Sequence, residues 1–120
     1  TNKILNKTKP LPQNLICVDP LPYLEFNYLL KNSVAIITDS GGITEEATVL
    51  NIPCLTLRDS TERPETVNIG TNMLVGNAPK SIEREIVKIL KGNWKTGSVP
   101  EKWDGKTGRR IVKILKKIKN

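Results

Sequence analysis

The sequence predicts an α/β fold built on a doubly wound parallel sheet. Short segments that are apolar throughout alternate along the chain with segments of helical periodicity. Strands that are apolar on both faces belong in a parallel sheet that helices cover on both sides. A pair of glycines also follows one of these apolar runs after an intervening Asp-Ser, at the place where open α/β sheets bind their ligands.

The first part of the chain is expected to form a loop, a strand, a helix and a second strand. After a proline-containing loop over residues 1–12, the apolar run LICV at 15–18 predicts a buried strand. Pro22 suits the first turn of a helix that continues to Asn32. The run VAIIT at 34–38 is apolar and β-branched, which predicts the second strand.

The middle of the chain continues the same alternation. The glycine pair at 41–42 is expected to turn the chain into a helix over 43–51, with Ile43, Ala47 and Leu50 on one face. The run IPCLTLR at 52–58 predicts the third strand, because a proline is tolerated at a strand's start. A polar loop with a short helix then leads to the fourth strand at 72–76.

The last third of the chain predicts two amphipathic helices. The first covers residues 79–91, with an apolar stripe of Ile82, Ile86, Ile89 and Leu90. An irregular connector follows, in which Trp94 and Trp103 are expected to act as packing anchors. The second helix covers residues 106–119 and has isoleucine, leucine and valine on one face and lysine on the other.

Composition excludes several kinds of chemistry. The chain has 120 residues, which suits one domain or part of one, and it contains no histidine. Ser-His-Asp and Cys-His catalysis are therefore excluded for this chain, and no metal-ligand spacing is present. Cys17 and Cys54 lie in expected strands, so we expect reduced core thiols in a cytoplasmic protein; a disulfide would require those strands to be neighbours.

The net charge of +7 is concentrated in the C-terminal third. Residues 1–80 carry seven basic and eight acidic side chains, whereas residues 81–120 carry twelve basic and four acidic ones. A basic amphipathic helix docks its apolar stripe on another part of the protein, lies on an anionic membrane, or binds nucleic acid. We favour the first reading, and expect neither membrane nor nucleic acid as a partner.

The run TDSGGITEEA at 38–47 combines groups that suit a phosphate. The amides at the start of a helix carry partial positive charge, and glycines allow a ligand to approach the backbone closely. Ser40 adds a hydroxyl, and Glu45 or Glu46 is placed to accept from sugar hydroxyls. A purely structural reading also stands: Ser40 caps the helix, the glycines form a tight turn, and the carboxylates complement the helix dipole.

The longer run TDSGGITEEATVLNIPCLTLRDSTERPETVNIGTNMLVG, at 38–76, resembles the C-terminal half of the non-hydrolysing UDP-N-acetylglucosamine 2-epimerases. The segments DPLPYLEFNYLL at 19–30 and WDGKTGRRIVKIL at 103–115 are similar to others of that family. The resemblance implies a Rossmann-like half of a two-domain fold of the glycosyltransferase-B type. Residues 1–120 are then a partial C-terminal UDP-binding domain, and the helix at 106–119 is expected to pack on an N-terminal half absent from the chain.

The resemblance also implies the nucleotide-sugar site, formed by Phe26, Ser40, Gly41, Gly42, Glu46 and Arg63. Ser40 and the two glycines match residues that hold the diphosphate, and Glu46 matches the residue that binds the ribose hydroxyls. Phe26 matches a residue beside the uracil, and Arg63 one that contacts the nucleotide-sugar. At Leu21 the family often has glutamine, so uracil recognition there is expected to use backbone groups.

From the residues alone, two of these assignments have plain structural alternatives. Phe26 lies on an apolar helix face and reads as a core residue. Arg63 reads as one member of a surface ion pair with Glu62, worth about 0–1 kcal/mol.

In the resembled family, the reaction interconverts UDP-GlcNAc and UDP-ManNAc by elimination and re-addition of UDP, with no cofactor and no metal. Its acid and base are carboxylates and a histidine located before the region present here, so this chain is expected to bind UDP without catalysing turnover alone. The expected partners are UDP or UDP-GlcNAc, the N-terminal domain and, in the whole enzyme, a second subunit. The alternatives are a UDP-sugar glycosyltransferase half or a binding module that uses the basic tail.

Overall fold

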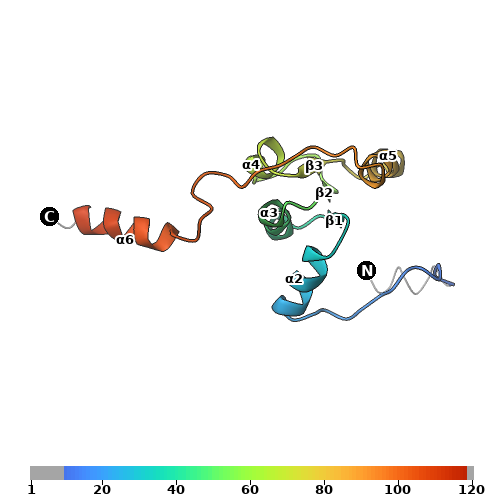
Figure 1. Ribbon diagram of the computed structural model, residues 1–120, viewed down its shortest axis with the longest axis horizontal. Helices are drawn as coiled ribbons and strands as arrows, with labels where there is room; N and C mark the ends of the chain where they lie inside the picture. Colours follow the sequence, from blue (N-terminus) through green and yellow to red (C-terminus); the bar gives the residue numbers. More distant parts are fainter. Residues whose placement is uncertain (1–9, 119–120) are drawn as a thin grey trace.

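The computed structural model describes residues 10–118, which fold around a three-stranded parallel sheet (Figure 1). The strands are β1 (Ile36–Thr38), β2 (Cys54–Thr56) and β3 (Asn72–Leu74), in the order β1-β2-β3. Ile37 lies opposite Leu55, which in turn lies opposite Met73. Because all strands run in one direction, their carboxyl ends meet at one edge of the sheet. The predicted α/β class with a parallel sheet is confirmed.

Within residues 10–118, five helices accompany the sheet: α2 (Tyr23–Lys31), α3 (Gly41–Leu50), α4 (Pro64–Asn68), α5 (Pro79–Leu90) and α6 (Thr107–Ile118). Each corresponds to a helix expected from the sequence. α4 and α5 begin with proline, whose fixed φ suits the first helical position and whose missing N–H costs nothing there. α3 ends at Asn51, which adopts the left-handed conformation with φ 56°.

The glycine pair does not form the expected turn. Gly41 and Gly42 are the first two residues of α3, and neither has a positive φ. The chain changes direction earlier, where Ser40 takes an extended conformation at the position before the helix. Glycine can adopt the ordinary helical conformation as well as a positive φ. The glycine pair was therefore compatible both with a turn before the helix and with the first turn of the helix.

The hydrophobic core lies between α2, α3 and the sheet. Its buried members are Leu30, Ile36, Ala47, Ile52 and Cys54, with Phe26, Ile43 and Leu50 packed against them. The predicted inward face of α3 is therefore confirmed. The connector after α5 packs back on β3 through Trp94, whose Nε1 donates to the Thr71 carbonyl at 2.9 Å.

The expected strand at 15–18 is wrong. Within the described residues this run pairs with no strand, and Ile16 is 83% exposed. Cys17 is exposed as well, so only Cys54 is the buried thiol that was expected. An apolar run gives only a local preference, whereas a strand requires a hydrogen-bonded neighbour, and β1 pairs with β2 alone among the described strands.

The predicted stripe of α5 needs one correction. Ile89 is buried and Ile82 and Ile86 are half-buried, but Leu90 is 71% exposed. Leu90 is the last residue of the helix, and the two residues after it are exposed as well, so the buried part of the stripe ends at Ile89.

α6 lies apart from the sheet, at the far end of the connector (Figure 1). None of its residues is buried, and its apolar stripe has no partner within residues 10–118. The expectation that it packs on another half of the protein remains a prediction, and Lys119 lies outside the described residues. No helix in the described part of the chain is long and apolar enough to cross a bilayer.

Candidate functional site

A hollow of about 320 Å³ lies beyond the carboxyl ends of β1 and β2. One wall is the first turn of α3, and the facing wall is the loop between β2 and α4. The residues that line it are Asp39, Gly41, Gly42, Thr44, Thr56, Arg58, Thr61, Glu62 and Arg63. The hollow thus brings together Gly41, Gly42 and Arg63, three of the site residues expected from the sequence.

The first turn of α3 is open towards solvent. The first amides of a helix have no partner within the helix, and the Ser40 side chain makes no capping bond to them. The Ser40 amide itself donates to Thr38 Oγ1 at 3.1 Å. A Cβ added to Gly41 would meet nothing within 4 Å. The positive end of the helix dipole therefore lies beneath uncovered backbone, which suits an anionic group.

Arg63 reaches this hollow from the position just before α4. Its Nε donates to Glu45 Oε1 on α3 at 2.6 Å, and the two side chains are 43% and 38% exposed. Its contact with Glu62 is a bond to the backbone carbonyl at 3.4 Å, so the alternative of an ion pair between those two side chains is wrong. The partner is instead the Glu45 carboxylate on α3. An ion pair this exposed contributes about 0–1 kcal/mol, so its value is in orienting the guanidinium.

Behind the hollow, a set of buried polar side chains links the sheet to Arg63. Thr56 Oγ1 on β2 donates to Asn72 Oδ1 on β3 at 2.6 Å. Asn72 Nδ2 donates to Thr66 Oγ1 on α4 at 3.0 Å, and Thr66 Oγ1 donates to the Arg63 carbonyl at 2.8 Å. Sequence reasoning missed this set, since threonine and asparagine in short elements give no burial signal.

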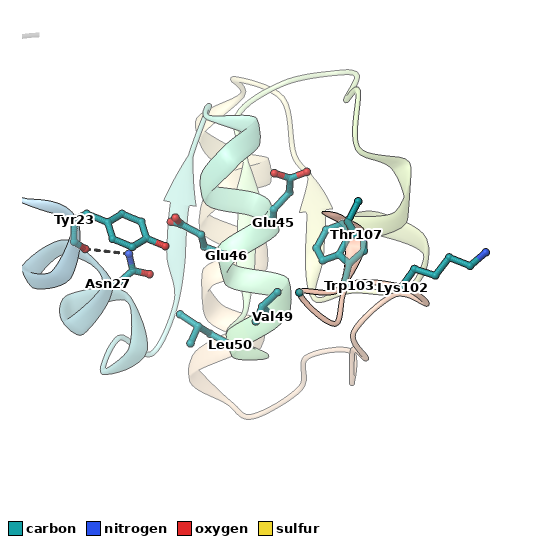
Figure 2. Close-up of a pocket in the computed structure, with 10 residues that line it drawn as sticks. Tyr23, Asn27, Glu45, Glu46, Val49, Leu50, Lys102, Trp103 and Thr107 are labelled. Carbon is teal, nitrogen blue, oxygen red and sulfur yellow. Dashed lines mark hydrogen bonds between the residues drawn. The ribbon is translucent and has the colours of Figure 1, made fainter. Parts of the chain in front are cut away.

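A second hollow, of about 440 Å³, lies on a neighbouring face of α3 (Figure 2). It is lined by Glu45, Glu46, Val49 and Leu50 of α3, Tyr23 and Asn27 of α2, and Lys102, Trp103, Gly105 and Thr107 of the connector and α6. Figure 2 shows the Glu46 side chain directed to the side of α3 where Tyr23 lies. Glu45 lines this hollow and bonds to Arg63 in the first, so it joins the two.

The remaining expected site residues lie close to these hollows. Ser40 is half-buried and immediately precedes the first turn of α3. Phe26 lies on α2 beside Asn27, and its ring packs against the core. Leu21, where the resembled family often has glutamine, is exposed.

A model of the UDP-N-acetylglucosamine 2-epimerase family matches residues 1–116. Among curated proteins, the UDP-N-acetylglucosamine 2-epimerase of Methanocaldococcus jannaschii is 53% identical over 100 residues, covering 82% of this chain and 26% of its own length. The enzyme of that name from Escherichia coli K12 is 40% identical over 119 residues, covering 96% of this chain and 31% of its own length. The chain thus spans less than a third of these relatives.

Solved structures give the same picture. A crystal structure of the M. jannaschii UDP-GlcNAc 2-epimerase in complex with UDP-GlcNAc and UDP matches with a TM-score of 0.77 and 44% identity, covering 95% of this chain and 31% of that one. The Neisseria meningitidis enzyme bound to UDP-GlcNAc matches with a TM-score of 0.63 and 37% identity, covering 86% of this chain and 29% of that one. The resemblance drawn from residues 38–76 and the predicted fold class, part of a glycosyltransferase-B-type fold, are confirmed.

Proposed function

Because the chain belongs to the UDP-N-acetylglucosamine 2-epimerase family, we propose that it forms the UDP-binding part of an enzyme that interconverts UDP-GlcNAc and UDP-ManNAc. The observation that carries the proposal is the first hollow, where the open first turn of α3 faces Arg63. A neighbour that covers 95% of this chain, the M. jannaschii enzyme, was solved with UDP-GlcNAc and UDP.

The diphosphate would lie over the first turn of α3. The amides of Gly41 and Gly42 and the Ser40 hydroxyl are the donors for its oxygens, and the Arg63 guanidinium neutralises part of its charge. When the bond between the sugar C1 and the phosphate oxygen breaks, negative charge develops on UDP. Donors that are already in place stabilise that charge without reorganising, so this part of the chain assists departure of UDP.

The nucleoside would extend from the diphosphate to the second hollow. Glu46 is placed there to accept from the ribose hydroxyls, as carboxylates do in nucleotide sites. Phe26 packs against the core from α2, which would hold its ring as a fixed apolar face beside the uracil.

The proton transfers would be carried out by another part of the enzyme. Epimerisation removes the proton from the sugar C2 as UDP leaves, and returns a proton to the opposite face as UDP adds back. The chain has no histidine, and we assign no acid or base within it. We therefore propose that the chain binds UDP but does not turn over alone, and that an N-terminal domain supplies the catalytic groups. We also propose that α6 docks on that domain and that the whole enzyme is a cytoplasmic homodimer.

Calorimetric titration with UDP, compared with ADP, tests the binding function. We expect UDP to bind, ADP to bind more weakly, and both Ser40→Ala and Arg63→Ala to weaken UDP binding. Arg84→Ala is a matched control, because Arg84 is an exposed arginine on α5 outside both hollows. A folded chain that binds no UDP, or binds it equally well in all three variants, would overturn the proposal.

A further inference from the structure

The backbone of Arg63 is held by a series of hydrogen bonds between buried side chains. Thr66 and Asn72 are 0% exposed, and Thr56 is 2% exposed. Thr56 donates to Asn72, Asn72 donates to Thr66, and Thr66 donates to the Arg63 carbonyl. Asn72 and Thr66 each accept one bond of the series and donate the next, so the bonds polarise each other in one direction, from the sheet to Arg63.

The position of α4 depends on this series of hydrogen bonds because the helix is short. It has five residues, and its first is Pro64, which lacks an amide proton. Isolated helices of this length are unstable, so the place of the segment is set by its tertiary contacts. The Arg63 carbonyl accepts from both the amide and the hydroxyl of Thr66, at 3.1 Å and 2.8 Å. On the other side, the Arg63 amide donates to Thr61 Oγ1 at 3.0 Å.

We infer that Thr66 and Asn72 are positioning residues for ligand binding by Arg63, an inference that rests on the proposed function. Neither side chain is accessible to a ligand, so their effect must pass through Arg63. Thr66 holds the backbone of Arg63, and Glu45 accepts from its Nε, so the side chain has a defined contact at each end before a ligand binds. Part of its ordering then precedes the arrival of the diphosphate, which lowers the entropy cost of binding.

Substitutions at Thr66 and Thr71 separate positioning from general stability. Both threonines are buried, and both donate their hydroxyl to a backbone carbonyl, Thr66 to Arg63 at 2.8 Å and Thr71 to Ile52 at 2.6 Å. Thr66→Val and Thr71→Val each remove one such bond, but only the first removes the link to Arg63. Thr66→Val also removes the oxygen that accepts from Asn72, so both parts of the proposed series are broken in this variant. Thr66→Ser keeps the hydroxyl and serves as the rescue variant.

Two measurements on the chain are compared among these variants. Calorimetry with UDP gives the affinity and, separately, the fraction of molecules able to bind, which accounts for any unfolded population. We expect Thr66→Val to lose about tenfold in UDP affinity, the effect of one misplaced hydrogen-bonding group, and Thr71→Val and Thr66→Ser to stay near wild type. Without ligand, the NMR resonance of the Arg63 Nε–Hε group reports its bond to Glu45 and should shift only in Thr66→Val.

The outcomes distinguish this inference from the proposed function. Equal losses of affinity in Thr66→Val and Thr71→Val, or an Arg63 resonance that is unchanged in Thr66→Val, would overturn the positioning role. A wild-type chain that binds no UDP would count against the proposed function instead. The ligand-free resonance comparison would then decide by itself whether Thr66 positions Arg63.

Discussion

The Gly41→Ala variant separates the structural and functional readings of the glycine pair, because they predict changes in opposite directions. The added methyl would meet nothing within 4 Å, and Gly41 has no positive φ, so the folded chain accommodates alanine without strain. Alanine has fewer conformations in the unfolded chain, which raises the free energy of unfolding by about 0.4–1 kcal/mol. For a chain of this size, that corresponds to a rise in the melting temperature of about 2–8 °C.

The same methyl would stand where the diphosphate is proposed to approach the backbone. We therefore expect UDP affinity to fall at least about tenfold, or about 1.4 kcal/mol, while stability rises. Thermal unfolding and calorimetry on the same sample measure both quantities. Gly108→Ala in α6 is the binding control, since its methyl also meets nothing within 4 Å and lies far from the proposed diphosphate position.

Two results would refute the reasoning about Gly41. Wild-type UDP affinity in Gly41→Ala would mean that no ligand group needs the space above this glycine. A lower melting temperature would mean that the open geometry around the residue is wrong.

Three further residues, Gly70, Cys54 and Glu85, give predictions about stability, thiol reactivity and pH. Gly70→Ala should lower the free energy of unfolding by about 1–3 kcal/mol in chemical denaturation, because its methyl would lie 2.5 Å from a buried threonine hydroxyl; an unchanged midpoint would contradict this. Burial raises the pKa of the Cys54 thiol from 9.0 to about 11, so a thiol reagent at about pH 8 should modify only the exposed Cys17 until denaturant is added. Since the unfolded Cys54 thiol ionises first, stability should also fall as the pH rises through that interval. Hydrogen bonds from Lys88, and then from Arg84, lower the pKa of the Glu85 carboxyl. Glu85 therefore contributes stability that is lost as the pH falls and the carboxyl becomes protonated, and Glu85→Gln lacks this contribution at every pH. The free energy of unfolding should accordingly fall less steeply with decreasing pH in Glu85→Gln than in the wild type.

Local sequence patterns located most of the elements around the site. The helices α2, α3 and α5 follow from apolar periodicity, supported by a proline just before α2 and another at the start of α5. The strands β1, β2 and β3 lie inside the predicted runs. The order of a strand, a glycine pair and a helix also placed Ser40 and Gly41 at the carboxyl edge of the sheet. The positions of these elements depend on residues that are close together in the sequence, so the sequence pattern is enough to predict them.

The partner of Arg63 was not predictable in the same way. Its carboxylate comes from Glu45, 18 residues earlier on another helix, whereas the sequence suggested the adjacent Glu62. The link from Thr66 to Asn72 likewise joins α4 to β3. Such contacts depend on how the elements pack, and no periodicity in a single segment indicates them.

The one failed strand and the unpartnered helix have a common explanation. The run at 15–18 and the stripe of α6 have the apolar composition of buried segments, yet both are exposed within the described residues. Burying a side chain of leucine size contributes about 1.5–3 kcal/mol, so a stripe of several such residues represents a large stabilisation that these segments do not receive here. An apolar pattern is typical of a segment that packs against another surface, and this chain spans less than a third of the length of these relatives. The exposed apolar stripe of α6 therefore supports the proposal that this helix docks on another part of the enzyme. In that proposal α6 lies beside the face where UDP would be held.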